Sequence, residues 1–266
     1  MSIDGGNIQR LSGHAEFVED CSFSVDCSHL VSCSGDQTVV LWDLQTGQKQ
    51  RTIGKHTGEV WACDYSKYGI YFCSASSDKT VCIWDHRSHG EIASFYGHTE
   101  TVWSCAFDPS WSSWRLASAS SDMTVKVWNW KTLSVEHSFE NHGNIVEHVT
   151  FSENGETLVS CGRDATVQIL ENFTDNSKRK LKILEGHEGR VNFCGFSCNN
   201  EGVILTCSDD KTIRTWDRVS GENRSVFTGH LNIVWSCDTR PLSNLTTVLA
   251  SCSSDKSLRY NFVRTP

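Results

Sequence analysis

Short apolar segments separated by turns recur along the chain. Val39–Trp42, Val81–Trp84 and Val125–Trp128 are rich in β-branched residues, end in tryptophan and are bounded by turn residues. β-branched and aromatic side chains fit the pleated surface of a sheet, whereas they lose rotamer freedom in a helix. Runs of this length between turns are typical of strands. The pattern therefore predicts an all-β chain.

Four kinds of residue repeat with a nearly constant period. Histidines stand at spacings of 42, 42, 44, 45 and 43 residues: His14, His56, His98, His142, His187 and His230. An aspartate follows each histidine by 22 to 25 residues: Asp36, Asp78, Asp122, Asp164, Asp210 and Asp255. Four residues before each aspartate stands a hydroxyl: Ser32, Ser74, Ser118, Ser160, Thr206 and Ser251. Six residues after it stand Trp42, Trp84, Trp128, Leu170, Trp216 and Asn261.

Gly-His, the Asp turn and Trp-Asp at this period resemble the WD-repeat (WD40) family over essentially the whole chain. The resemblance implies a single β-propeller domain over residues 1–266, with one four-stranded antiparallel blade per repeat. The repeats would span residues 14–55, 56–97, 98–141, 142–186, 187–229 and 230–263. Each repeat of this family supplies three strands of one blade and the outer strand of the next.

Outer strands are expected near residues 8–12, 50–53, 92–96, 134–139, 180–184 and 224–227. The N-terminal segment 6–13 would then complete the last blade and close a six-bladed ring without exposed sheet edges. An open ring, or a seven-blade propeller that lacks one blade, is the alternative.

The resemblance also implies that histidine, hydroxyl, aspartate and tryptophan form a buried hydrogen-bonded tetrad in each blade, because buried polar groups need partners. We predict structural tetrads at His14, Ser32, Asp36 and Trp42; His56, Ser74, Asp78 and Trp84; His98, Ser118, Asp122 and Trp128; and His187, Thr206, Asp210 and Trp216. Six equivalent sites cannot each be an active centre, so no catalytic residue is predicted. Leu170 and Asn261 leave two tetrads incomplete, and blades 4 and 6 are expected to be softer.

Composition narrows the classes of partner. The net charge of −8 disfavours nucleic acid, which needs a basic surface. Most of the 13 cysteines follow the repeat, at positions where alanine or valine stands in other copies, so packing is favoured over a metal site or disulfides. Without a signal-peptide pattern or a long apolar run, we expect an intracellular protein, in the cytoplasm or the nucleus, with no cofactor and no membrane contact.

Binding residues of this family commonly lie on the narrow top face, three and five places after the histidine and directly before the aspartate. These positions hold Phe17, Glu19, Glu59, Trp61, Trp103, Ile145, Glu147, Arg163, Arg190, Ile233 and Trp235. Aromatic side chains with acidic neighbours suit a protein or peptide partner with a hydrophobic or basic anchor, such as a free or methylated lysine. Alternatively, the tryptophans lean on neighbouring blades and are partly buried.

Two further features suggest contacts. Trp84, Asp85 and Arg87 resemble the Trp-Asp-x-Arg box by which some WD-repeat proteins dock on the adaptor of cullin-RING ubiquitin ligases, although a solvated turn has the same composition. Trp111 and Trp114 suggest a contact on the side of blade 3, or alternatively they cover the edge of the core. The predicted function is a non-catalytic interaction scaffold. The alternatives are a substrate-recruiting ligase subunit and an enzyme or small-molecule binder that uses the central channel.

Overall fold

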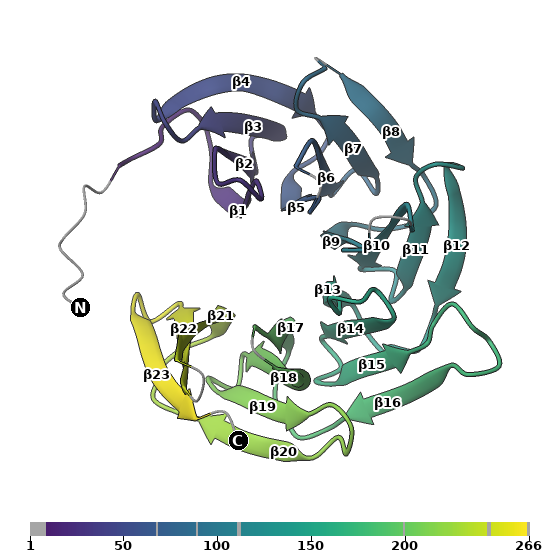
Figure 1. Ribbon diagram of the computed structural model, residues 1–266, viewed down its shortest axis with the longest axis vertical. Helices are drawn as coiled ribbons and strands as arrows, with labels where there is room; N and C mark the ends of the chain where they lie inside the picture. The colour runs from purple at the N-terminus through teal and green to yellow at the C-terminus, as the bar shows by residue number, and fades with distance from the viewer. Residues whose placement is uncertain are drawn as a thin grey trace.

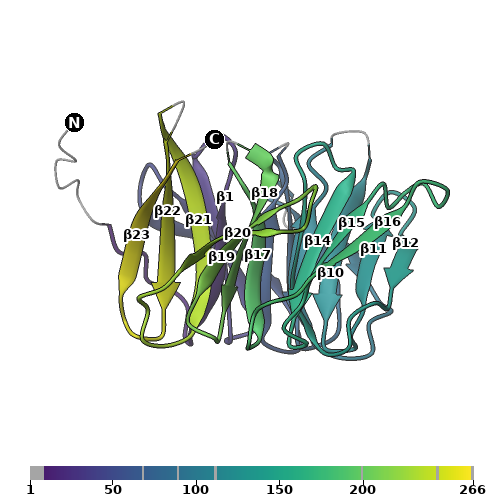
Figure 2. The ribbon, with the colours of Figure 1, turned by 90° about the horizontal axis from the view of Figure 1, so that it is seen from below.

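The protein consists of antiparallel β-sheets arranged around a central axis (Figure 1). The computed structural model describes residues 9–67, 69–88, 90–110, 113–198, 200–243 and 246–264, and these residues contain strands but no helix. Figure 2 shows the strands crossing the thickness of the disc, so that the turns gather on its two faces. The six sheets confirm the predicted all-β architecture of six blades.

Each blade is a sheet whose strands pair in chain order. Blade 1 holds β1 (Val18–Phe23), β2 (His29–Ser34), β3 (Thr38–Asp43) and β4 (Gln48–Lys55). Blade 2 holds β5 (Val60–Tyr65), β6 (Tyr71–Ser76), β7 (Val81–Asp85) and β8 (Glu91–Phe95). Blade 3 holds β9 (Val102–Phe107), β10 (Arg115–Ser120), β11 (Val125–Asn129) and β12 (Ser134–Phe139). Blade 4 holds β13 (Val146–Phe151), β14 (Thr157–Gly162), β15 (Val167–Glu171) and β16 (Lys180–Leu184). Blade 5 holds β17 (Val191–Ser197), β18 (Asn200–Ser208), β19 (Ile213–Asp217) and β20 (Asn223–Phe227). Blade 6 holds β21 (Val234–Ser243), β22 (Thr246–Ser253) and β23 (Leu258–Arg264).

The turn between the second and third strands has the same conformation in every blade. The residue after the repeat aspartate has a positive φ of 61 to 73° at Gln37, Lys79, Met123, Ala165, Lys211 and Lys256. Side chains with a Cβ rarely adopt this conformation. The aspartate offsets its cost, because its carboxylate accepts the backbone N–H of the residue two places on, as Asp78 does from Thr80 at 3.1 Å.

The apolar core lies between the blades. Five buried clusters occupy the five junctions from blades 1 and 2 to blades 5 and 6. Strands such as β7 are covered on both faces, which explains why Val81–Trp84 is almost uninterruptedly apolar. The blades are therefore held together mainly by packing across their junctions.

The closure that we predicted does not appear among the described residues. Residues 6–8 lie outside the described residues, and residues 9–13 form no strand, so the sixth sheet has three described strands. Leu11 packs against Leu30, Val40 and Trp42 of blade 1 instead. Figure 1 shows a wider space between blades 6 and 1 than between other neighbours. The open-ring alternative describes this arrangement.

Side chains that are buried at the other junctions are exposed at this opening. The valine four residues after the histidine is fully buried in blades 2 to 6, but Val18 of blade 1 is 55% exposed. Likewise, the residue three places after the aspartate is at most 4% exposed in blades 1 to 5, but Leu258 of blade 6 is 83% exposed. The first and last blades thus keep interface-type surfaces that no described residue covers.

Candidate functional site

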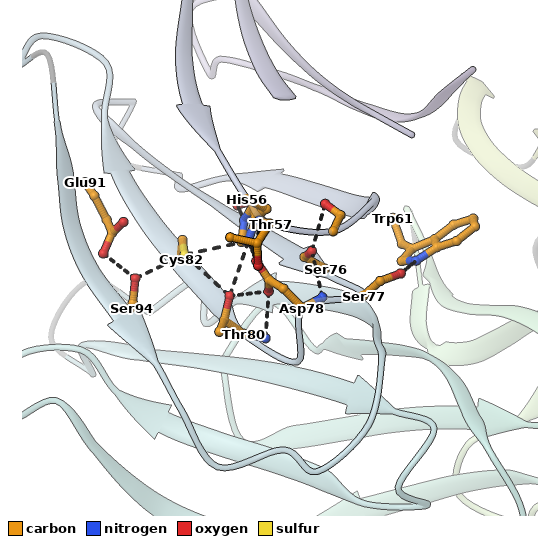
Figure 3. Close-up of polar contacts among 12 residues, drawn as sticks. His56, Thr57, Trp61, Ser76, Ser77, Asp78, Thr80, Cys82, Glu91 and Ser94 are labelled. Atoms are coloured by element: carbon orange, nitrogen blue, oxygen red, sulfur yellow. Dashed lines mark hydrogen bonds and ion pairs between the residues drawn. The ribbon is translucent and has the colours of Figure 1, made fainter. Parts of the chain in front are cut away.

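The repeat histidines, hydroxyls and aspartates come together in all six blades. Histidine Nδ1 lies 2.7–3.0 Å from an aspartate oxygen. Histidine Nε2 lies 2.7–2.9 Å from the serine or threonine hydroxyl. In four blades the indole N–H of tryptophan donates to the same hydroxyl, at 2.8–2.9 Å: Trp42, Trp84, Trp128 and Trp216. Figure 3 shows the His56 and Asp78 part of this network.

Hydrogen bonds keep the tetrad carboxylates ionised. Burial alone would raise the pKa of Asp78, but donors from His56, Thr80 and the Thr57 backbone outweigh it and hold the pKa well below its usual range. Both carboxylate oxygens are engaged, by Thr80 on one side and by His56 and Thr57 on the other. Neither carboxylate oxygen is free to accept a hydrogen bond from a substrate, which indicates a structural rather than a catalytic role.

The top face is formed by the Asp turns and by the connections that enter each blade. Three of its tryptophans donate their indole N–H to a serine of the Asp turn in their own blade: Trp61 to Ser77 and Trp103 to Ser121 at 2.7 Å, and Trp235 to Ser254 at 2.6 Å (Figure 3 shows the first pair). The rings of Trp61 and Trp103 lie 4.6 Å apart, and both are partly buried. Trp235 is 46% exposed.

The half of the top face formed by blades 4 to 6 is rich in arginine. Glu147 pairs with Arg163 at 2.5 Å and with Arg190 at 3.4 Å. The Arg163 guanidinium lies 5.7 Å from the centre of the Trp103 ring, and that of Arg190 lies 5.3 Å from that of Trp235. The chain's own arginines therefore neutralise Glu147 and approach the rings of Trp103 and Trp235.

The half formed by blades 1 and 2 is acidic. Glu19 and Glu59 are exposed, and neither forms an ion pair with any described residue. Burial and the nearby charge of Glu59 raise the pKa of Glu19. Phe17 is 84% exposed on the same side, whereas Ile145 and Ile233 are partly buried. The predicted top-face positions thus separate into an acidic, aromatic half and an arginine-rich half.

The predicted ligase-adaptor contact is accessible only in part. The Arg87 side chain is 63% exposed, and its backbone N–H donates to Asp85 at 2.7 Å. Trp84 is 3% exposed and donates to Ser74, so it cannot be touched by a partner. Placing Trp84 in that contact was wrong, because the same tryptophan is required in the tetrad.

A cavity of about 560 Å³ lies at one end of the innermost strands, between residues such as Phe23, Phe107 and Phe151. Asp20 and Asp64 lie on these innermost strands. Each binds a backbone N–H of the next blade, Asp20 that of Cys63 at 3.1 Å and Asp64 that of Phe107 at 2.8 Å. Burial raises the pKa of Asp64 to about 6, and the charge of Asp20 adds to the effect. Asp64 is the only charged residue of β5, and this was the signal that sequence reasoning missed.

The described ranges contain no metal-ligating cluster and no membrane-spanning helix. No group of three or more histidine, cysteine or acidic side chains there is arranged to hold a metal ion. No helix there is long and apolar enough to cross a membrane. All 13 cysteines are free thiols.

Comparison with known proteins agrees with this geometry. The family model "WD domain, G-beta repeat" matches residues 5–43, 47–85, 90–129, 133–170, 178–217 and 221–260. Over 136 residues, or 48% of this chain, the sequence is 30% identical to the guanine nucleotide-binding protein subunit beta of Oryza sativa subsp. indica, of which 36% is covered. Over 118 residues (44%) it is 30% identical to human apoptotic protease-activating factor 1, of which 9% is covered. Over 104 residues (39%) it is 30% identical to nuclear distribution protein PAC1 of Candida dubliniensis, of which 20% is covered. The matches therefore span only a minor part of each relative's length.

Proposed function

Because the chain belongs to the WD40 family of WD-domain, G-beta repeat proteins, we propose that it is a non-catalytic scaffold that binds a protein or peptide partner on its top face. Proteins of this family generally act as protein-interaction scaffolds. The observation that carries the proposal is the group of three tryptophans that serine hydrogen bonds orient on one face. Aromatic side chains held in place before binding are effective anchors, because little entropy is lost when a partner packs on them.

The charges of the top face suggest what the partner carries. A basic side chain would be attracted to Glu19 and Glu59, which have no counter-ion in the described chain. Cation–π capture of a lysine is less suited to Trp103 and Trp235, whose rings the chain's own arginines approach. We therefore propose a partner segment with a basic residue toward blades 1 and 2 and an apolar residue on the tryptophans.

The test compares the partners of wild type with those of a Trp61→Ala, Trp103→Ala, Trp235→Ala triple variant by affinity purification and quantitative mass spectrometry. The matched control is Val219→Ala, which removes an exposed apolar side chain from the turn between β19 and β20, on the opposite face and outside both proposed sites. We expect the triple variant to lose partners that the control retains. Identical partner sets for wild type and the triple variant would refute a top-face site.

The basic anchor is tested separately with a partner identified in this way. Glu19→Gln combined with Glu59→Gln should weaken its binding and reduce the dependence of binding on salt, because screening acts on exposed charges. Unchanged affinity and salt dependence would show that the partner's charge lies elsewhere.

Recruitment to a cullin-RING ligase is a second candidate, favoured by the exposed guanidinium of Arg87. Arg87→Ala and Arg87→Asp should then abolish co-purification of a ligase adaptor. Lys131→Ala is the matched control, since Lys131 also stands three residues after a tetrad tryptophan and is exposed. Absence of an adaptor from the wild-type purification would remove this candidate.

We propose neither catalysis nor a cofactor, since Asp20 and Asp64, two carboxylates of the innermost strands, already accept backbone N–H groups. We also propose an intracellular location, in the cytoplasm or the nucleus. The free state of all 13 cysteines supports it, because thiols persist in reducing compartments. Fluorescence microscopy of a tagged chain would distinguish the two locations.

A further inference from the structure

A small aromatic pocket opens on the bottom face, between blades 2 and 3. Its volume is about 60 Å³, and its walls include Tyr71, Phe107, Trp114 and Trp130. The Trp130 ring lies at the centre of this wall, 4.5 Å from the ring of Trp114, 5.1 Å from that of Tyr71 and 6.4 Å from that of Phe107. Residues 111 and 112, in the same loop as Trp114, lie outside the described residues. We call this site the Trp114 pocket.

Backbone contacts hold the two tryptophans in place. The N–H of Trp130 donates to the carbonyl of Trp114 at 2.9 Å, which ties the turn after β11 to the loop before β10. The Trp114 side chain nevertheless remains 38% exposed. The pocket is therefore a preformed surface with an accessible ring, in the manner of ligand sites that are largely formed before binding.

Polar groups at the pocket lack partners. Ser66 is 4% exposed, and its buried hydroxyl has no hydrogen-bond partner. Neither Trp114 nor Trp130 donates its indole N–H to a described residue. The other seven described tryptophans all donate theirs to a serine or threonine: Trp42, Trp61, Trp84, Trp103, Trp128, Trp216 and Trp235. Unpaired donors in an apolar wall favour a ligand that brings acceptors.

The charges around the pocket disfavour a cationic ligand. The Asp108 side chain is fully buried and pairs with Arg115 at 3.4 Å, and Arg115 also pairs with Glu136 at 2.9 Å. Lys131 Nζ lies 5.4 Å from the centre of the Trp114 ring. The two carboxylates are thus balanced by Arg115 and Lys131, and a cationic ligand would bring a third positive charge to these two cations. The ligand should be neutral and apolar, with hydrogen-bond acceptors.

We propose that the Trp114 pocket binds a proline-containing extended segment of a partner protein. A proline ring is compact and apolar, and it packs on aromatic faces. A polyproline II segment has no internal hydrogen bonds, so its carbonyls are free to accept the indole N–H groups of Trp114 and Trp130 and the hydroxyl of Ser66. This site is on the opposite face from the proposed top-face site and does not depend on it.

A display library of random dodecapeptides, selected on the wild-type protein and counter-selected on Trp114→Ala, tests the proposal. We expect the enriched peptides to share at least one proline at a fixed position. In ¹H–¹⁵N spectra, the best peptide should shift the indole signals of Trp114 and Trp130 and leave that of Trp61 in place. Far-UV circular dichroism and thermal unfolding check that the variant used for counter-selection is folded.

Two more variants test the hydrogen-bond donors of the site one at a time. They also replace Trp114→Ala if that variant does not fold. Trp130→Phe keeps an aromatic wall but removes one donor, and Ser66→Ala removes the buried hydroxyl. Each should weaken the selected peptide about fivefold, as expected for one hydrogen bond worth about 1 kcal/mol. Trp235→Ala, on the top face, should leave its affinity unchanged.

Three results would overturn the proposal. The selection could yield no peptide whose binding depends on the pocket residues. The enriched peptides could lack proline, or their conserved residue could be lysine or arginine. None of them would bear on the top-face proposal, which is tested with other variants.

Discussion

Ser118→Ala is expected to destabilise blade 3 about twice as much as Ser160→Ala destabilises blade 4. The Ser118 hydroxyl lies 2.7 Å from His98 Nε2 and accepts the Trp128 indole N–H at 2.8 Å. The Ser160 hydroxyl lies 2.8 Å from its histidine, but the tryptophan position of that blade holds a leucine. Both serines are buried, at 0% and 8% exposure. The two substitutions therefore differ mainly in how many buried polar groups they leave unpaired.

Each buried group left without a partner costs about 1–3 kcal/mol. We therefore expect Ser118→Ala to cost about 2–6 kcal/mol and Ser160→Ala about 1–3 kcal/mol. Because stacked repeats can unfold separately, a single global unfolding curve is insufficient. Hydrogen exchange with mass spectrometry, read on peptides from β10 and β14, gives the opening free energy of each blade. Ser134→Ala, on an exposed outer strand, should change it by less than about 0.5 kcal/mol. Equal losses in the two blades would refute the argument that the shared hydroxyl is the weak point.

Three further outcomes follow from burial. The pKa of Asp64 is raised from its ordinary value of 3.8 to about 6 in the fold, so the free energy of unfolding should increase by up to about 3 kcal/mol as the pH falls from 7.5 to below 4. Asp64→Asn should remove this increase, which calorimetry would detect as a smaller rise of Tm on acidification. An unaltered pH dependence of Tm in the variant would contradict the argument. Val18→Ala should cost less than about 0.5 kcal/mol and Val60→Ala about 2 kcal/mol in urea unfolding, whereas similar costs would indicate that the opening is covered in solution. Iodoacetamide should modify exposed Cys21 in the native protein before buried Cys63, as peptide mass spectrometry would report, and equal labelling would contradict the fold.

The blades could be predicted from the sequence because buried polar groups require partners, so histidine, hydroxyl and aspartate recur together in all six repeats. The resemblance of this pattern to the WD-repeat family then implied six blades. The same requirement explains why placing Trp84 in a partner contact failed, since its indole N–H is already used.

Contacts between blades could not be predicted in this way. Arg190 meets Glu147 of the preceding blade, 43 residues away, and the Trp114 pocket joins Tyr71 of blade 2 to Trp130 of blade 3. No pattern in the local sequence indicates which side chains two neighbouring sheets bring into contact. The N-terminal segment illustrates the same limit, since its sequence fits an outer strand but pairing it with β23 depends on the geometry of the whole ring.

The opening between blades 6 and 1 gives the molecule two ends. In a closed ring every blade has two neighbours, so unfolding one blade breaks two interfaces at once. Unfolding a terminal blade of an open array breaks only one interface. Local unfolding is therefore expected to start at blades 1 and 6 and to move inward. The outer side of β23, along which Tyr260 and Phe262 are exposed, has no pairing strand among the described residues. Such an edge is a template for strands of other molecules, and at high concentration this protein is expected to self-associate there.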